Sequence, residues 1–165
     1  MKYILYVIFI LLGVISRLIP HAPNFTPILA IALMSGLYIK KKFIVLLPIS
    51  IMLVSDLIIG SHATVFWVYL SLILISLIGQ VIKNNTSNIL LYSILSSVLF
   101  FIITNFGVWS FGGYGYTFAG LIMSYTMAIP FFNNTLFSTF IFSLGIYMAN
   151  YIIGFYSVKY QISNL

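Results

Sequence analysis

Six long apolar runs, separated by short gaps that hold most of the charge, limit what this chain can fold into more than any other feature. Of its 165 residues, 62% are hydrophobic and only 5% are charged, whereas a soluble domain has about 25% charged residues. An apolar run of about 20 residues spans a bilayer as a helix, and no run shows the short alternating pattern of barrel strands. The sequence therefore predicts an all-α, polytopic membrane protein with one transmembrane domain, residues 1–165.

The apolar runs predict transmembrane helices at about 3–18, 26–39, 43–58, 64–82, 88–106 and 135–156. A Pro-rich break at Pro20, Pro23 and Pro27 separates the first two, because proline disfavours helix in the residue before it. We expect Asn24 and Thr26 to cap the start of the second span.

A shorter apolar piece, 118–129, precedes the sixth span. At about 12 residues it is too short to cross a bilayer. We expect a short helix that lies at the outer surface or folds partly back into the membrane, with Pro130 ending it. Asn133 or Asn134 is then expected to cap the sixth span.

The lysines predict the orientation of these spans. Lys2 precedes the first span, Lys40–Lys42 separate the second and third, Lys83 separates the fourth and fifth, and Lys159 follows the sixth. With six spans all of these positions fall on one side, which the positive-inside rule places in the cytoplasm together with both termini. The net charge of +6 therefore needs no nucleic-acid partner. The opposite edge collects the Pro-rich segment, the residues after Asp56, and the Gly- and aromatic-rich stretch 105–117.

Arg17 is the only arginine and Asp56 the only acidic residue, and on this topology both lie near the outer ends of their spans. Intramembrane charges often pair with one another, so one interpretation is a structural ion pair that ties the first span to the third. The other is that one or both contact a ligand, Arg17 gripping a carboxylate or phosphate and Asp56 accepting from an amine or ring N–H. The two interpretations are compatible if a ligand binds to the Arg17–Asp56 ion pair.

Other chemistry is limited by what the chain contains. It has no cysteine and no second carboxylate, which excludes thiolate metal sites and paired-acid hydrolysis. His21 and His62 could join Asp56 in a two-histidine, one-carboxylate metal site, although such histidines more often bond locally. We predict no enzyme activity, no catalytic residue, no cofactor and no metal.

The chain resembles a family of small bacterial membrane proteins whose members are uncharacterised. The residues that carry the likeness are the segment 17–27 (RLIPHAPNFTP), Ser55-Asp56, the segment 105–109 (NFGVW) and the segment 128–135 (AIPFFNNT). That family is similar in size and hydropathy to the substrate-binding S components of energy-coupling factor (ECF) vitamin transporters. The resemblance implies a six-helix bundle in the bacterial inner membrane, cytoplasmic termini, and a small-molecule pocket near the outer face covered by loops.

One feature of S components is missing from this sequence. They typically carry an Ala-x-x-x-Ala-like face on the first helix, where they dock on a shared transmembrane partner. The first apolar run here has only Gly13 and Ser16 as small residues. Docking through another face, such as Ala32 and Gly36, and action without a coupling subunit are the two alternatives.

We therefore predict a membrane uptake protein that binds a vitamin-like or nucleobase-like solute from the extracytoplasmic side. Its partners would be this ligand, the lipid bilayer and a transmembrane coupling subunit. The candidate ligand-binding residues are Arg17 for an anionic group, Asp56 for a cationic or N–H group, Asn105 for an amide-type contact, Trp109 and Tyr114 for stacking, and His21 and Asn24 at the entrance. The alternative is a structural or assembly subunit in which Arg17 and Asp56 only hold the fold together. A membrane enzyme that uses His21, Asp56 and His62 is a third possibility.

Overall fold

The computed structural model describes residues 2–39 and 43–163, so the predicted turn at Lys40–Lys42 lies outside the described residues. Within this part the chain forms seven α-helices and no strand. They are α1 (Lys2–Leu18), α2 (Ile28–Tyr38), α3 (Leu46–Ile59), α4 (Val65–Ile78), α5 (Thr86–Ser110), α6 (Phe118–Thr126) and α7 (Ile129–Ser163), with a 3-10 turn, η2 (Gly79–Val81), after α4. The all-α prediction is confirmed, and each predicted span overlaps one of the helices other than α6.

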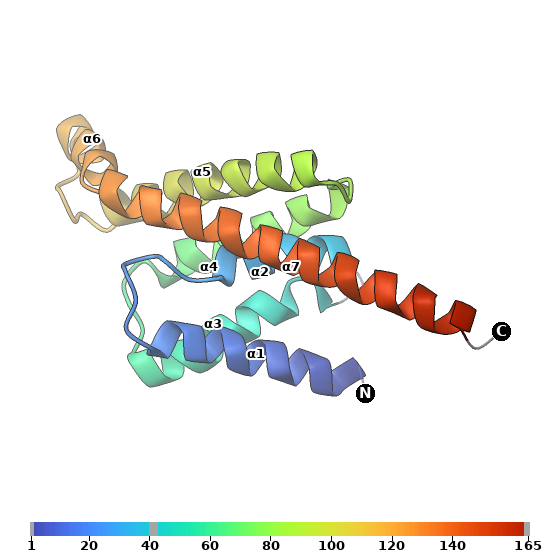
Figure 1. Ribbon diagram of the computed structural model, residues 1–165. Coiled ribbons are helices and arrows are strands. Elements are labelled where there is room, and N and C mark those ends of the chain that lie inside the picture. The colour runs from blue at the N-terminus through green and yellow to red at the C-terminus, as the bar shows by residue number, and fades with distance from the viewer. Residues whose placement is uncertain (1, 40–42, 164–165) are drawn as a thin grey trace.

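The six longer helices run alternately in opposite directions (Figure 1). The start of α1, the turn between η2 and α5, and the end of α7 lie at one end of the bundle. The connection 19–27, the connection 60–64 and the short helix α6 lie at the other end. The sequence segments that were predicted to share one edge therefore do lie together.

Helix α2 forms the centre of the bundle. It packs against α3, α4, α5 and α7, and every residue from Ile28 to Gly36 is buried. A helix that is apolar all round is stable only when other elements cover it on all sides. Ala30, Ala32 and Leu33 are completely inaccessible to solvent, so α2 is the core around which the longer helices are arranged.

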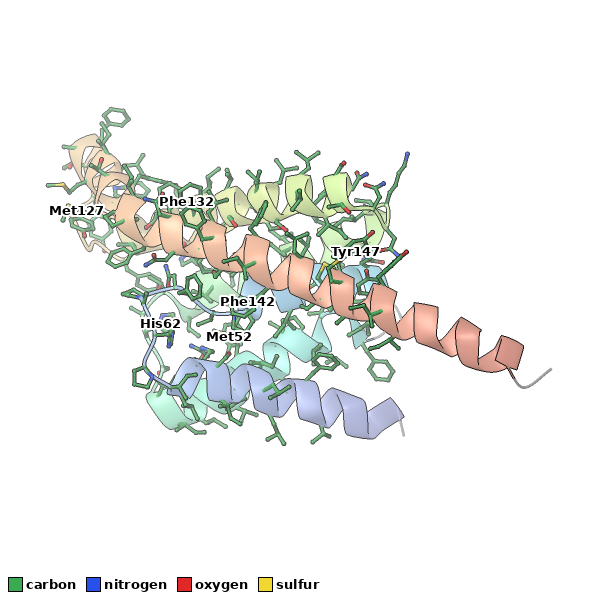
Figure 2. All side chains as sticks on the ribbon, in the orientation of Figure 1. Met52, His62, Met127, Phe132, Phe142 and Tyr147 are labelled. Atoms are coloured by element: carbon green, nitrogen blue, oxygen red, sulfur yellow. The ribbon has the colours of Figure 1, made fainter. Side chains whose placement is uncertain are left out.

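The other helices place small polar residues inward and large apolar residues outward. Their buried polar residues are mostly Ser and Thr: Ser55, Ser71, Ser76, Ser93, Ser96, Ser97, Ser124, Thr135, Ser138, Thr139 and Ser143. Many of these hydroxyls donate to a carbonyl oxygen of their own helix, as Ser93 does to Ile89 at 2.8 Å. Leu57, by contrast, is 86% exposed, and apolar side chains project from the outward faces of the helices (Figure 2). The surface is therefore more apolar than parts of the interior.

Two helical segments are long and apolar enough to cross a membrane, Thr86–Ser110 and Ile129–Gly154. The other apolar helices are shorter, between 10 and 17 residues over their described apolar stretches. Asn85 caps the first of the two long segments, its side chain accepting from the backbone N–H of Asn88 at 2.9 Å. By length and composition, these two segments suggest that the chain associates with a membrane.

The region before the sixth predicted span differs from the prediction. Helix α6 ends at Thr126, and α7 begins at Ile129, six residues earlier than expected. Pro130 therefore lies in the first turn of α7 rather than ending the preceding helix. A proline fits this place because the first turn leaves its N–H groups unpaired in any case. Asn133 and Asn134 consequently lie inside α7 and do not cap it.

Two further expectations about α2 are wrong. Its N-cap residue is Pro27, with no side-chain hydrogen bond, because Asn24 and Thr26 belong to a separate turn in which the Thr26 N–H donates to the Asn24 carbonyl at 3.1 Å. The face of Ala32 and Gly36 is also unavailable to a partner protein, since both residues are buried within the bundle.

Gly36 and Gly79 allow α2 to approach η2 closely. A Cβ on Gly36 would lie 2.6 Å from Gly79 Cα, and a Cβ on Gly79 would lie 2.9 Å from Gly36 Cα. Both clashes involve backbone, which cannot rotate away as a flexible side chain can. Small residues at such crossings let helix backbones pack in direct contact.

We expect Gly36→Ala to lower the free energy of unfolding by about 1–3 kcal/mol, because the added methyl overpacks this contact. The measurement is thermal unfolding of the purified protein. The matched control is Gly145→Ala in α7, where a Cβ meets nothing within 4 Å and the better helix propensity of alanine should be neutral or stabilising. Equal unfolding temperatures for the two variants would contradict the close packing.

Candidate functional site

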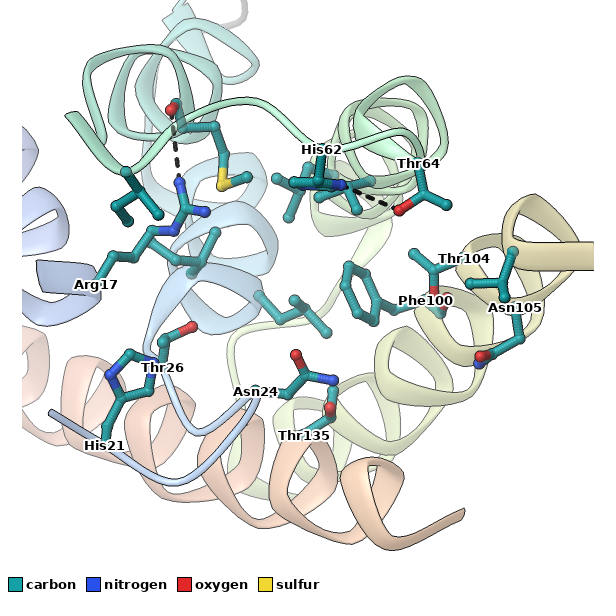
Figure 3. Close-up of a pocket in the computed structure, with 17 residues that line it drawn as sticks. Arg17, His21, Asn24, Thr26, His62, Thr64, Phe100, Thr104, Asn105 and Thr135 are labelled. Carbon is teal, nitrogen blue, oxygen red and sulfur yellow. Dashed lines mark hydrogen bonds between the residues drawn. The ribbon is translucent and has the colours of Figure 1, made fainter. Parts of the chain in front are cut away.

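A cavity of about 490 Å³ opens at the end of the bundle that holds the connections 19–27 and 60–64. It is bordered by parts of α1, α2, α3, α4, α5 and α7 and by both connections (Figure 3). The polar residues in its lining are Arg17, His21, Asn24, Thr26, His62, Thr64, Thr104, Asn105 and Thr135, and the apolar ones are Ile28, Leu29, Met52, Ile59, Val68, Leu72, Phe100 and Val108. Four of the seven predicted ligand-binding residues, Arg17, His21, Asn24 and Asn105, therefore border one space.

Arg17 lies at the end of α1 and bonds across to α3. Its Nη1 donates to Asp56 Oδ1 at 2.7 Å, to Ser55 Oγ, and to the Met52 carbonyl at 3.5 Å. The two charged side chains are largely buried, 16% exposed for Arg17 and 9% for Asp56. The predicted pairing of the only arginine with the only acid is thus present in the structure.

Asp56 does not line the cavity. Its second carboxylate oxygen, Oδ2, accepts a hydrogen bond from the Tyr69 hydroxyl of α4 at 2.9 Å. Both carboxylate oxygens are therefore occupied by protein groups, and the carboxylate joins three helices. Asp56 positions Arg17 in this arrangement, and the guanidinium alone reaches the cavity wall (Figure 3).

Asn24 adopts a left-handed backbone conformation, with φ of 62°, the one positive φ of a non-glycine residue in the described chain. Asparagine tolerates this region better than most residues, and such outliers occur often at functional sites. Helix α7 holds the segment in place: Asn134 Nδ2 donates to the Pro23 carbonyl at 3.0 Å, and the rings of Phe25 and Phe142 pack edge to face at 6.1 Å. The side chain of Asn24 borders the cavity.

Asn105 lies on α5 and is 9% exposed. Its Nδ2 donates to the Phe101 carbonyl at 2.7 Å, and its amide oxygen has no hydrogen bond with the described protein groups. The neighbouring Thr104 and the ring of Phe100 line the cavity from the same helix. A second, smaller cavity of about 70 Å³ adjoins this wall and shares Asn24 and Asn105 with the first.

The two histidines are at the mouth of the cavity and are exposed. His21 Nδ1 lies 2.7 Å from the Ile19 carbonyl oxygen, which only accepts, so Nδ1 carries the hydrogen. In the neutral ring Nε2 is then an acceptor. His62 Nδ1 lies 3.1 Å from Thr64 Oγ1. For these histidines the sequence left two possibilities, a metal site and local hydrogen bonds, and the structure shows the local hydrogen bonds.

The metal-site alternative finds no geometric basis. In the part of the chain that the structure describes, which includes His21, Asp56 and His62, no three His, Cys, Asp or Glu side chains gather as metal ligands would. The membrane-enzyme interpretation required these three side chains to come within metal-binding reach. The three side chains do not meet this requirement.

Trp109 and Tyr114 do not line the cavity. The indole Nε1 of Trp109 donates to the Thr117 carbonyl at 3.1 Å and its ring packs on Phe106 at 5.4 Å, so Trp109 anchors the loop between α5 and α6. Tyr114 lies in this loop and is 43% exposed. The aromatic ring that does face the cavity is Phe100 (Figure 3).

The sequence interpretation missed Phe100 and the four threonines of the lining, Thr26, Thr64, Thr104 and Thr135. A usable signal was present for α5. One face of this helix contains Phe100, Thr104, Asn105 and Val108, by their spacing. If Asn105 lines a site, the other three residues of that face are therefore expected to line it as well. The threonines of the other elements carry no comparable sequence pattern.

Residues 1–161 match the model of a family described as a family of unknown function (DUF6580), and the chain belongs to this family. No curated protein and no solved structure matches the chain. The expectation of membership in an uncharacterised family is thereby confirmed.

Asn24 offers a test of the loop conformation. Asn24→Ala should lower the free energy of unfolding by about 1–2 kcal/mol, because a left-handed backbone costs an alanine about this much. Asn24→Gly should unfold close to the wild-type temperature, because glycine adopts positive φ without that cost. Thermal unfolding of both variants gives the comparison. If alanine and glycine were equally tolerated, the left-handed conformation would not be present in the folded protein.

Proposed function

We propose that this protein is a membrane uptake protein that binds a small vitamin-like or nucleobase-like solute from the extracytoplasmic side, in the manner of an S component. The observation that carries the proposal is the cavity of about 490 Å³ at one end of the bundle. Small-molecule pockets usually measure about 300–1,000 Å³ and combine an apolar wall with a few convergent polar groups. Arg17, Asn24 and Asn105 supply such groups from three separate segments.

The proposal includes six membrane spans, formed by α1 to α5 and α7. Leu57 on α3, Leu12 on α1 and Phe66 on α4 are each more than half exposed, as lipid-facing residues are. The short helix α2, 11 residues long, measures only about 17 Å at 1.5 Å per residue. The segment 19–27 would complete its path across the bilayer. Non-helical backbone at membrane depth is tolerated where it lines a cavity or is buried in protein, and this segment borders the cavity.

The orientation follows from the lysines. The turn 82–85, which contains Lys83, is at the end of the bundle opposite the cavity, where α1 begins and α7 ends (Figure 1). With this end in the cytoplasm, the cavity opens to the outside of a bacterial inner membrane. A coupling subunit would have to dock on a surface other than Ala32 and Gly36, because α2 is enclosed by the bundle.

The alternative is a structural or assembly subunit. It is favoured by the Arg17–Asp56 pair, in which both carboxylate oxygens of Asp56 are bonded to protein groups without a ligand. A purely structural role, however, gives no reason for a large polar cavity beside that pair. A close-packed core with few voids is the usual state of a protein interior, so the cavity favours ligand binding.

Reporter fusions test the proposed topology. Alkaline phosphatase fused after Ser61 or Gly113 should be active, because the connection 60–64 and the loop between α5 and α6, which contain these residues, lie at the cavity end, which we propose is outside the cytoplasm. Alkaline phosphatase fused after Lys83 or at the C-terminus should be inactive. Green fluorescent protein fused at the same two positions should fluoresce, because it folds in the cytoplasm. Activity of the enzyme after Lys83 would overturn the proposed orientation.

Ligand binding is tested by thermal shift with a panel of water-soluble vitamins, nucleobases and their precursors. A ligand at 100 times its dissociation constant should stabilise the folded protein by about 2.7 kcal/mol. Thr104→Trp, which places a large ring in the cavity, should abolish this shift. The control is Ile102→Trp, on the same helix but 49% exposed, which should retain it. Equal shifts in both variants would show that the ligand binds elsewhere.

A further inference from the structure

We infer that the cavity selects solutes without net charge that carry an acceptor such as a carbonyl at one edge and N–H donors at the opposite edge. This inference rests on the proposed function and specifies its ligand. Uncharged heterocycles with cyclic amide groups have this chemistry. Carboxylates, phosphates and amines of similar size do not.

The charges around the cavity favour a ligand without net charge. Apart from the histidines, Arg17 is the one ionisable residue in the lining. Its charge is matched by Asp56, 2.7 Å away behind the cavity wall. An anionic ligand on Arg17 would place two negative charges on one guanidinium that is only 16% exposed. An ion pair with an extra buried charge is unfavourable because the excess charge loses hydration without a partner.

A cationic ligand is disfavoured for a different reason. The carboxylate of Asp56 is the only side-chain carboxylate in the chain, and it does not line the cavity. Its two oxygens accept from Arg17 and from Tyr69. A bound amine would therefore face neutral acceptors only, together with the nearby positive charge of Arg17.

The hydrogen-bonding groups have a direction across the cavity. Thr104 Oγ1 donates to the Phe100 carbonyl at 2.8 Å, and Thr135 Oγ1 donates to the Phe131 carbonyl at 3.0 Å. Each hydroxyl has one hydrogen, so what these two threonines offer a ligand is acceptor lone pairs. The Asn105 amide oxygen, which has no partner among the described protein groups, adds a third acceptor.

Arg17 lies on the other side of the cavity from Thr104 and Asn105 (Figure 3). A guanidinium only donates hydrogen bonds, and the bonds described for Arg17 all involve Nη1. The remaining N–H groups suit a carbonyl or ring acceptor of the ligand. The cavity thus has only donors at Arg17 of α1 and mainly acceptors at α5 and α7, where the amide N–H groups of Asn24 and Asn105 can also donate, with Phe100 as an aromatic wall beside them.

The test uses matched probes on the purified wild-type protein, all measured at pH 8. The pairs are uracil against its 6-carboxylate and nicotinamide against nicotinate, with 1-methylnicotinamide as the cation, alongside the panel above. Uncharged members should bind at least about tenfold more tightly than their charged counterparts, which corresponds to about 1.4 kcal/mol. If the binders are carboxylates, phosphates or amines, this inference is overturned and the proposed function is retained. If no member of the panel binds, the proposed function fails as well.

A variant tests the role of Asp56 directly. Asp56→Asn leaves Arg17 with an unbalanced positive charge, so the preference within each pair should shift at least about tenfold toward the carboxylate. Tyr69→Phe removes a hydrogen bond to the same carboxylate but no charge, and should keep the wild-type preference. An unchanged preference in folded Asp56→Asn would refute the charge balance. The wild-type comparison decides the inference by itself if this variant does not fold.

Discussion

The salt bridge between Arg17 and Asp56 is the interaction on which the arrangement of this protein depends. Helix α1 packs mainly on α3, and the guanidinium closes that contact at the cavity end, where the Tyr69 hydroxyl extends it to α4. Removing one partner of a buried ion pair typically costs about 3–5 kcal/mol, because the other charge is left without compensation. The pair therefore fixes the position of α1 and, through it, the donor side of the cavity.

The distribution of polarity explains how such a pair can exist in so apolar a chain. The interior contains α2 together with serine and threonine hydroxyls that bond to their own helices, whereas large apolar residues such as Leu57 face outward. Hydroxyls satisfied in this way can be buried at little cost. An interior of small residues also lets helices approach closely, as Gly36 and Gly79 do. Bulky residues then remain for the outer surface, where a lipid environment would accept them.

The sequence predicted the positions of the helices well because apolar runs and prolines leave a strong local signal. It also predicted the Arg17–Asp56 pair, because a chain with one arginine and one acid offers few other partners. The sequence-based prediction was wrong where a residue type is compatible with two local structures. Pro130 can end a helix or lie in the first turn of the next one, and the structure shows the second. Phe100 and the cavity threonines were missed because their role comes from tertiary placement, which no pattern of residue types records.

The segment 19–27, which is not helical, forms part of the cavity wall. Three prolines prevent α1 and α2 from meeting in a tight helical turn, and α7 fixes the segment through Asn134 and Phe142. Asn24 absorbs the remaining change of direction in a left-handed conformation. The irregular backbone of this segment borders the cavity, and Asn24 supplies one of the cavity's polar groups. The same prolines and contacts with α7 that shape the connection therefore also position part of the site.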